Sequence, residues 1–318
     1  MAIPREFPFP AYPVGWFQVA YSDELEPGQV MPLEYWGRGL VLFRTDDGEA
    51  VLMDAYCPHL GAHLGYGGVV EGDEIKCPFH AWKFGKDGGC TNIPYGKKIS
   101  SKAKVKTWHL EEKNGLIMTW FHPDDEPPTW SLPDVVEFGD EAWTTYEKRR
   151  WKIRTRNQEM AENAVDSAHF RFLHGTKNIP ESVASSEGHV MSVTSPTVSS
   201  NKYGDVEGTI QVEMHGFGFT TTRFTGIVET LLVNSVTPID EEHVDVRFAF
   251  VVRKISDRGT TETIAALYIA EIERQLEQDI PIWENKVYIK PPILSDGDGP
   301  IGKYRKWCKQ FYAEGTAG

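Results

Sequence analysis

The pattern of apolar and polar positions changes near residue 125. Between Gly15 and His122 the apolar runs are short, for example 41–43, 50–53 and 115–120, and Asp-Gly, Asn-Gly or Gly-Gly pairs separate them. Short runs bounded by such turn pairs are typical of strands. This part of the chain is therefore predicted to form a small all-β unit.

The second part carries longer patterns. Residues 209–214, 217–228 and 243–252 alternate like strands and predict an antiparallel sheet. Two helical patterns flank them, at 158–174 and at 261 to about 289, where large apolar residues recur at helical spacing. The predicted fold class is α+β, with an all-β N-terminal domain followed by an antiparallel sheet flanked by helices.

An acidic, proline-bearing segment, Asp124–Pro128, lies between the two parts of the chain that differ in hydrophobic pattern. Such composition is common in linkers between domains. A chain of 318 residues also exceeds the usual size of one hydrophobic core. We therefore predict two domains, 1–125 and 126–318.

Composition excludes several classes of partner. The formal net charge of −13 argues against nucleic acid and anionic membrane surfaces, which attract basic proteins. The N-terminus has no basic region followed by an apolar run, and no stretch reaches the roughly 18 apolar residues of a membrane span. Four cysteines are too few for a disulfide framework in a chain of this length, so we expect a cytoplasmic protein.

The first candidate metal site has the pattern C-x-H-x17-C-x2-H, formed by Cys57, His59, Cys77 and His80. Two thiolates and two imidazoles could bind zinc. However, each half supplies one cysteine and one histidine. Two loops can then place both thiolates on one iron and both imidazoles on the other, which is the Rieske [2Fe-2S] arrangement. Cys90 and His63 fall outside the pattern and are expected to be packed or surface residues.

The second candidate site is D-x2-H-x4-H, formed by Asp166, His169 and His174. Asp166 and His169 would share one face of a continuous helix. His169 and His174 would point roughly 140° apart on it. Both can face one atom only if the helix contains a π-bulge or ends at His174, where Gly175 is a suitable C-terminal cap. The alternative is two core histidines and a capping aspartate.

A two-histidine iron(II) site uses one carboxylate as its third ligand and leaves positions open for O2. Asp279 lies on the flank of the apolar stripe of the predicted helix 261–289. A carboxylate turned toward a core is costly unless it is paired or bound to metal. Asp279 is therefore the predicted third ligand, with Glu273 as the alternative.

These segments together resemble one family. The segment from Cys57 to His80, followed by Ala81-Trp82, is similar to the cluster-binding segment of Rieske non-haem iron oxygenases, and the second site with Gln278–Trp283 resembles their mononuclear iron site. The resemblance implies a catalytic domain of the helix-grip type and a head-to-tail homotrimer. It also implies catalytic roles for Asn163 and Asp166, with the Asp166 carboxylate bridging His80 of a neighbouring subunit and His169.

The same resemblance implies the cofactors and electron donors. They are a [2Fe-2S] cluster, mononuclear Fe(II), O2 as co-substrate, and NAD(P)H used indirectly through a ferredoxin, a flavin reductase or both. No strand is followed by G-x-G-x-x-G, so the chain is not expected to bind the nucleotide itself. Five lysines between Lys97 and Lys106 could steer an acidic donor, or could protect an exposed edge strand from aggregation.

The substrate is expected to be apolar. Seven phenylalanines stand on segments expected to line the cavity: Phe170, Phe172, Phe217, Phe219, Phe224, Phe248 and Phe250. Segments 163–174 and 279–312 most resemble the steroid-acting group, the 3-ketosteroid 9α-hydroxylase oxygenases and cholesterol 7-desaturases. Hydroxylation of a steroid or similar polycyclic is expected; desaturation, aromatic O- or N-demethylation, ring dihydroxylation, and a Rieske electron-transfer protein remain alternatives.

Overall fold

The computed structural model describes residues 7–201, 204–255 and 257–313. These residues form two compact units. One contains 16–121 and 125–131, and the other contains 7–15, 122–124 and 132–313. The second unit thus combines the N-terminal segment 7–15 with residues from the C-terminal part of the sequence.

The first unit is built from short strands in three sheets, ordered β1-β10-β9, β2-β3-β4 and β5-β6-β7-β8. The elements are β1 (Gly15–Tyr21), η1 (Ser22–Glu24), β2 (Val30–Tyr35), β3 (Arg38–Arg44), β4 (Ala50–Asp54), β5 (Val69–Glu71), β6 (Glu74–Lys76), β7 (Lys83–Phe84), β8 (Cys90–Asn92), β9 (Leu110–Lys113) and β10 (Leu116–Phe121). The all-β prediction is confirmed. At the β9–β10 turn, Asn114 and Gly115 both have positive φ, +54° and +73°, as a two-residue Asn-Gly hairpin requires.

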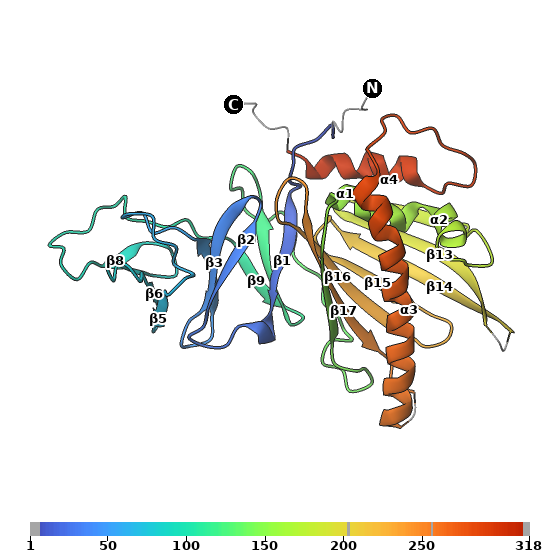
Figure 1. Cartoon of the computed structure of the whole chain (residues 1–318), viewed down its shortest axis with the longest axis horizontal. Coiled ribbons are helices and arrows are strands. Elements are labelled where there is room, and N and C mark those ends of the chain that lie inside the picture. Colours follow the sequence, from blue (N-terminus) through green and yellow to red (C-terminus); the bar gives the residue numbers. More distant parts are fainter. Residues whose placement is uncertain (1–6, 202–203, 256, 314–318) are drawn as a thin grey trace. The chain divides into compact units, whose positions relative to one another are not determined.

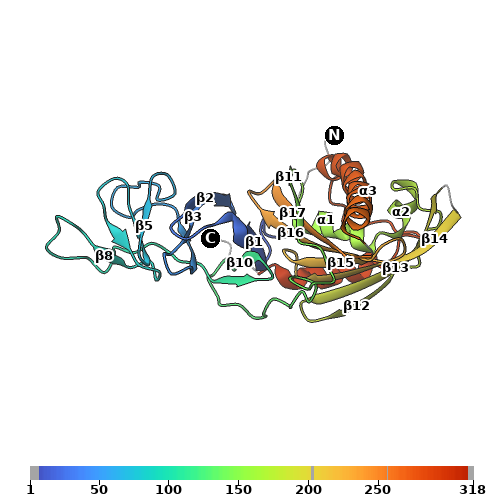
Figure 2. The same ribbon diagram turned by 90° about the horizontal axis from the view of Figure 1, so that it is seen from below.

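The second unit contains a seven-stranded antiparallel sheet, ordered β11-β17-β16-β15-β14-β13-β12, with the long helix α3 across one face (Figures 1 and 2). The elements are β11 (Glu147–Ile153), α1 (Asn157–Ala161), η2 (Glu162–Val165), α2 (Ser167–Phe172), β12 (Val183–Glu187), β13 (Val190–Asn201), β14 (Gly204–His215), β15 (Thr220–Phe224), β16 (Thr230–Pro238), β17 (Val244–Val252), α3 (Arg258–Asn285), α4 (Ile301–Cys308) and η3 (Lys309–Phe311).

Helix α3 begins where the Asp257 side chain accepts a hydrogen bond from the Thr260 amide. It packs Ile269, Leu276 and Trp283 against the sheet in one hydrophobic core, as the helical spacing predicted. Among the helices that the structure describes, none is both long and apolar enough to cross a membrane.

Two predicted elements are wrong in extent. The expected strand 217–228 is paired only over β15, since Phe217 packs against Trp307 and Phe311 instead, and Gly226 turns the chain with φ +122°. The expected continuous helix 158–174 is broken at Asp166, whose backbone is extended (φ −84°, ψ 102°). Its side chain caps a new helix, α2, and this local hydrogen bonding overrides the helical pattern.

Candidate functional site

The two cluster loops have equivalent backbone geometry. In the first, the Gly61 amide donates to the Cys57 carbonyl over 3.0 Å, and in the second the Ala81 amide donates to the Cys77 carbonyl over 3.1 Å. The donor residue has positive φ in both loops, +76° at Gly61 and +57° at Ala81. Each loop therefore folds into the same tight turn, although only the first uses glycine, which adopts this conformation without strain.

These turns bring the four predicted ligands together in pairs. Cys57 and Cys77 are buried in one hydrophobic core, and burial, with Cys77 nearby, raises the pKa of the Cys57 thiol to about 11. The rings of His59 and His80 lie 4.8 Å apart. The Nδ1 atom of His80 is buried and has no hydrogen-bond partner among the described residues. A buried ring nitrogen left without a partner suits a metal ligand, so the four residues fit a Rieske cluster.

The two residues outside the motif have other contacts. Cys90 is partly buried against the core that contains the cluster thiols, and burial raises the pKa of its thiol. His63 accepts a hydrogen bond from the Gly65 amide at Nδ1 and packs edge-on against Tyr56. Both residues thus support the loops.

In the second site, Asp166 and His169 are fixed by the start of α2. The Asp166 carboxylate accepts hydrogen bonds from the amides of Ala168 and His169. The His169 ring nitrogen Nδ1 lies 2.5 Å from the Asp166 carbonyl oxygen. A carbonyl only accepts, so Nδ1 carries the hydrogen and Nε2 has a free lone pair.

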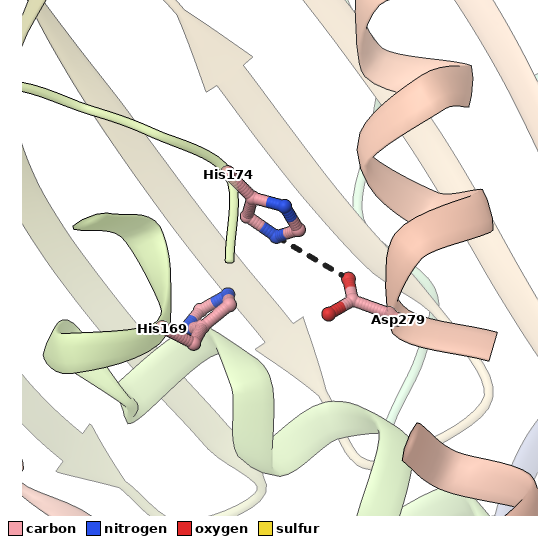
Figure 3. A group of neighbouring side chains, drawn as sticks. All are labelled: His169, His174 and Asp279. Atoms are coloured by element: carbon pink, nitrogen blue, oxygen red, sulfur yellow. Dashed lines mark ion pairs between the residues drawn. The ribbon is translucent and has the colours of Figure 1, made fainter. Parts of the chain in front are cut away.

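His174 lies just beyond the end of α2, and its ring reaches α3. Its Nδ1 is 3.1 Å from Gln278 Oε1, and its Nε2 is 3.5 Å from Asp279 Oδ2. Ligand atoms of His169, His174 and Asp279 all lie within 4.8 Å of one another, with both rings turned toward the carboxylate (Figure 3). Because α2 ends at Phe172, His174 leaves the helical repeat, and two histidines five residues apart can face one point.

Burial favours the metal-binding form of His169. It lowers the pKa of His169, an effect that the charges of Asp166 and Asp279 only partly oppose. The neutral imidazole that results is the form that binds metal. Two imidazoles and one carboxylate on adjacent elements form the facial donor set of non-haem iron(II) sites, with further positions open.

The other predicted site residues have distinct environments. Oδ2 of Asp166 is 3.9 Å from Nδ1 of His169, so the hydrogen bond expected between them is made by the Asp166 carbonyl instead. The Oδ1 atom of Asn163 accepts a hydrogen bond from the Trp283 indole over 3.3 Å. Glu273, the alternative third ligand, forms an ion pair with Arg149 and is not part of the three-residue group.

A cavity adjoins the three-residue group. It has about 920 Å³ of empty space, counting open solvent at its mouth, and its wall is mostly apolar. Of the seven predicted phenylalanines, Phe170, Phe217, Phe224 and Phe248 line it. The prediction is wrong for Phe172, which is 77% exposed. It is also wrong for Phe219 and Phe250, which are buried outside the lining.

Comparison with known proteins identifies the family. Residues 15–109 match the Rieske [2Fe-2S] domain, and residues 119–312 match the 3-ketosteroid 9alpha-hydroxylase C-terminal domain. The chain belongs to the Rieske non-haem iron oxygenases. Proteins of this family carry a Rieske cluster and mononuclear iron, and they use O2 with electrons from a reductase. The alternative of a free Rieske electron carrier does not explain why residues 119–312 match an oxygenase C-terminal domain.

Two relatives illustrate the likeness of this Rieske oxygenase to the steroid group. It is 33% identical to cholesterol 7-desaturase nvd of Xenopus laevis, covering 96% of this chain and 73% of that one. It is 30% identical to the oxygenase component of 3-ketosteroid-9-alpha-monooxygenase of Rhodococcus rhodochrous, covering 94% and 81%. The resemblance to this group that the motifs predict is confirmed.

Solved structures share the fold. Dicamba monooxygenase bound to dicamba has a TM-score of 0.78 at 16% identity, covering 93% of this chain and 96% of that one. NdmA of Pseudomonas putida CBB5 with caffeine has a TM-score of 0.75 at 20% identity, covering 92% and 89%. The predicted α+β fold class is thereby confirmed.

Proposed function

We propose that this oxygenase component hydroxylates a steroid or a comparably bulky polycyclic compound, with His169, His174 and Asp279 as the ligands of its mononuclear iron. The observation that carries the proposal is that these three side chains lie within 4.8 Å of one another beside a largely apolar cavity. When bound there, ferrous iron would supply the position at which O2 is activated.

The surrounding residues would prepare the site. The Asp166 carbonyl and the Gln278 amide oxygen engage Nδ1 of the two rings and orient Nε2 toward the metal. The apolar wall would exclude water and hold a hydrocarbon surface by burial. Cys57, His59, Cys77 and His80 would hold the cluster, where two neutral imidazoles raise its reduction potential.

We further propose a homotrimer in which the Asp166 carboxylate links the cluster of one subunit to the iron of the next. Family likeness supports this, and so does the 34% exposure of the Asp166 side chain despite its capping role. Asp166→Asn retains a capping side chain and removes the charge, whereas Asp166→Ala removes both. If either variant keeps normal iron content and also wild-type turnover, the bridging role is wrong.

A separate donor would dock near the lysines that follow the cluster loops. Lys97, Lys98, Lys102 and Lys104 are exposed, whereas Lys106 forms an ion pair with Asp125. Residues 93–109 form no regular strand, but Lys104 forms an isolated antiparallel bridge with Gly89, so protection of a sheet edge remains the alternative role of these lysines. Charge reversal of these lysines should slow cluster reduction at low ionic strength and have less effect in salt. If neither charge reversal nor added salt changes the reduction rate, the proposal that the donor docks at these lysines is wrong.

The substrate assignment needs a direct test. Coupled O2 consumption with a surrogate reductase should respond to steroids and not to small aromatic acids, and product analysis would separate hydroxylation from desaturation. A response to methoxy- or N-methylaromatics alone would instead support demethylation. Metal analysis should give about three irons per chain, two of them in the cluster. The cytoplasmic location stays a prediction that rests on cysteine usage.

A further inference from the structure

The sheet wall of the cavity contains a row of four residues with a polar centre. The row crosses four strands, with Met214 on β14, Thr220 on β15, Asn234 on β16 and Phe248 on β17. Each is the direct cross-strand partner of the next, and all four line the cavity. Directly opposed side chains on one face have Cβ atoms about 4.5–5.5 Å apart. The Thr220 hydroxyl and the Asn234 amide can therefore reach one shared atom.

The next row has no such pair. There Thr222 stands between Val212 and Leu232, so its hydroxyl has apolar neighbours on both sides. In the described parts of the chain, the side chains of Thr220 and Asn234 form no hydrogen bond with other protein groups, although Thr220 is only 8% exposed. Asn234 is partly buried. A buried hydroxyl without a partner costs free energy that a matching ligand atom recovers.

We propose that Thr220 and Asn234 form an anchor for one carbonyl or hydroxyl oxygen on an otherwise apolar polycyclic substrate. This inference rests on the proposed function and names the substrate class more closely. An amide and a hydroxyl both donate and accept, so the pair suits either oxygen. The cavity lies between this wall and the group of His169, His174 and Asp279. Fixing an oxygen at the wall therefore determines which carbon faces the iron.

The test measures binding of three probes to the intact protein without O2: androstane, which has no oxygen, and its monoketones androstan-3-one and androstan-17-one. Wild-type protein should bind at least one ketone about tenfold more tightly than androstane, a ratio typical of one good hydrogen bond. Asn234→Leu and Thr220→Val should each reduce this ratio toward one without weakening androstane binding. Thr222→Val is the matched control and should leave the ratio unchanged.

A second variant keeps the test informative if Asn234→Leu folds poorly. Asn234→Asp replaces the amide donor with a carboxylate, so it should favour androstan-3-ol over androstan-3-one, the reverse of any ketone preference. A wild-type ratio near one, or a ratio that survives both Asn234→Leu and Thr220→Val, would overturn the anchor. If no androstane probe binds wild-type protein, the steroid assignment fails instead, and fluorene with fluorenone then tests the anchor by the same ratio.

Discussion

Replacing Asp279 with alanine tests the mononuclear site through stability, without any need for turnover. Asp279 is 8% exposed, and its Oδ2 lies 3.5 Å from Nε2 of His174. In metal-free protein, removing this carboxylate relieves the cost of its burial but also loses packing and the contact with His174. These effects oppose each other, so we expect the melting temperature of the metal-free protein to change little.

The rise in melting temperature that Fe(II) binding causes should change strongly. At a free Fe(II) concentration about 100 times Kd, binding to the native state alone stabilises it by about 2.7 kcal/mol. For a unit of this size the melting temperature then rises by about 5–11 °C, at roughly 2–4 °C per kcal/mol. Loss of an outer partner of a ligand already weakens metal binding about 10–100-fold, so loss of a ligand should weaken it at least about 100-fold. The same Fe(II) concentration would then shift the melting temperature of Asp279→Ala by only about 1–2 °C.

The measurement is anaerobic calorimetry with and without Fe(II), accompanied by iron analysis and visible spectra of the cluster. Glu277→Gln is the matched control, because Glu277 is an exposed carboxylate on the same helix. It should retain the full shift. A wild-type metal-dependent shift in Asp279→Ala would refute the assignment of this carboxylate as a ligand.

Three further predictions concern one residue beside each site and one buried carboxylate elsewhere. Gln278→Leu should weaken Fe(II) binding about 10–100-fold in a metal titration, since the hydrogen-bond acceptor for Nδ1 of His174 is lost. Ala81→Gly should raise the free energy of unfolding by about 0.5–1 kcal/mol without altering the cluster spectrum, because it relieves a positive φ; an unchanged value would mean that the turn is unstrained. Burial raises the pKa of Glu159, so the native state binds this proton more tightly than the unfolded chain, and stability falls as pH rises from the ordinary value of 4.5 through the raised one. Glu159→Gln should therefore be more stable than wild type at pH 8 in urea unfolding, with the difference shrinking toward pH 4.5, and a difference independent of pH would contradict the burial argument.

The sequence predicted the candidate ligands because their signals are local. Cys57 and His59 share one loop, and Cys77 and His80 share another, so spacing alone pairs thiolate with imidazole. Asp279 was recognisable because helical periodicity put a carboxylate beside an apolar stripe. The partner of the His174 ring was not recognisable. Gln278 is 104 residues away along the chain, and only packing of α3 beside the end of α2 brings the two together.

The break at Asp166 shows how a periodic pattern can mispredict the extent of a helix while Asp166 and His169 still lie in contact. In a continuous helix Asp166 and His169 would share a face. In the structure Asp166 is instead the N-cap of α2 and His169 is the third helical residue, the position from which a side chain reaches back to the cap backbone. An aspartate three residues before a histidine is compatible with both arrangements, and in the structure the Asp166 carbonyl lies against the ring. That contact fixes the imidazole tautomer in the protein itself, so Nε2 of His169 is ready to bind before any metal arrives.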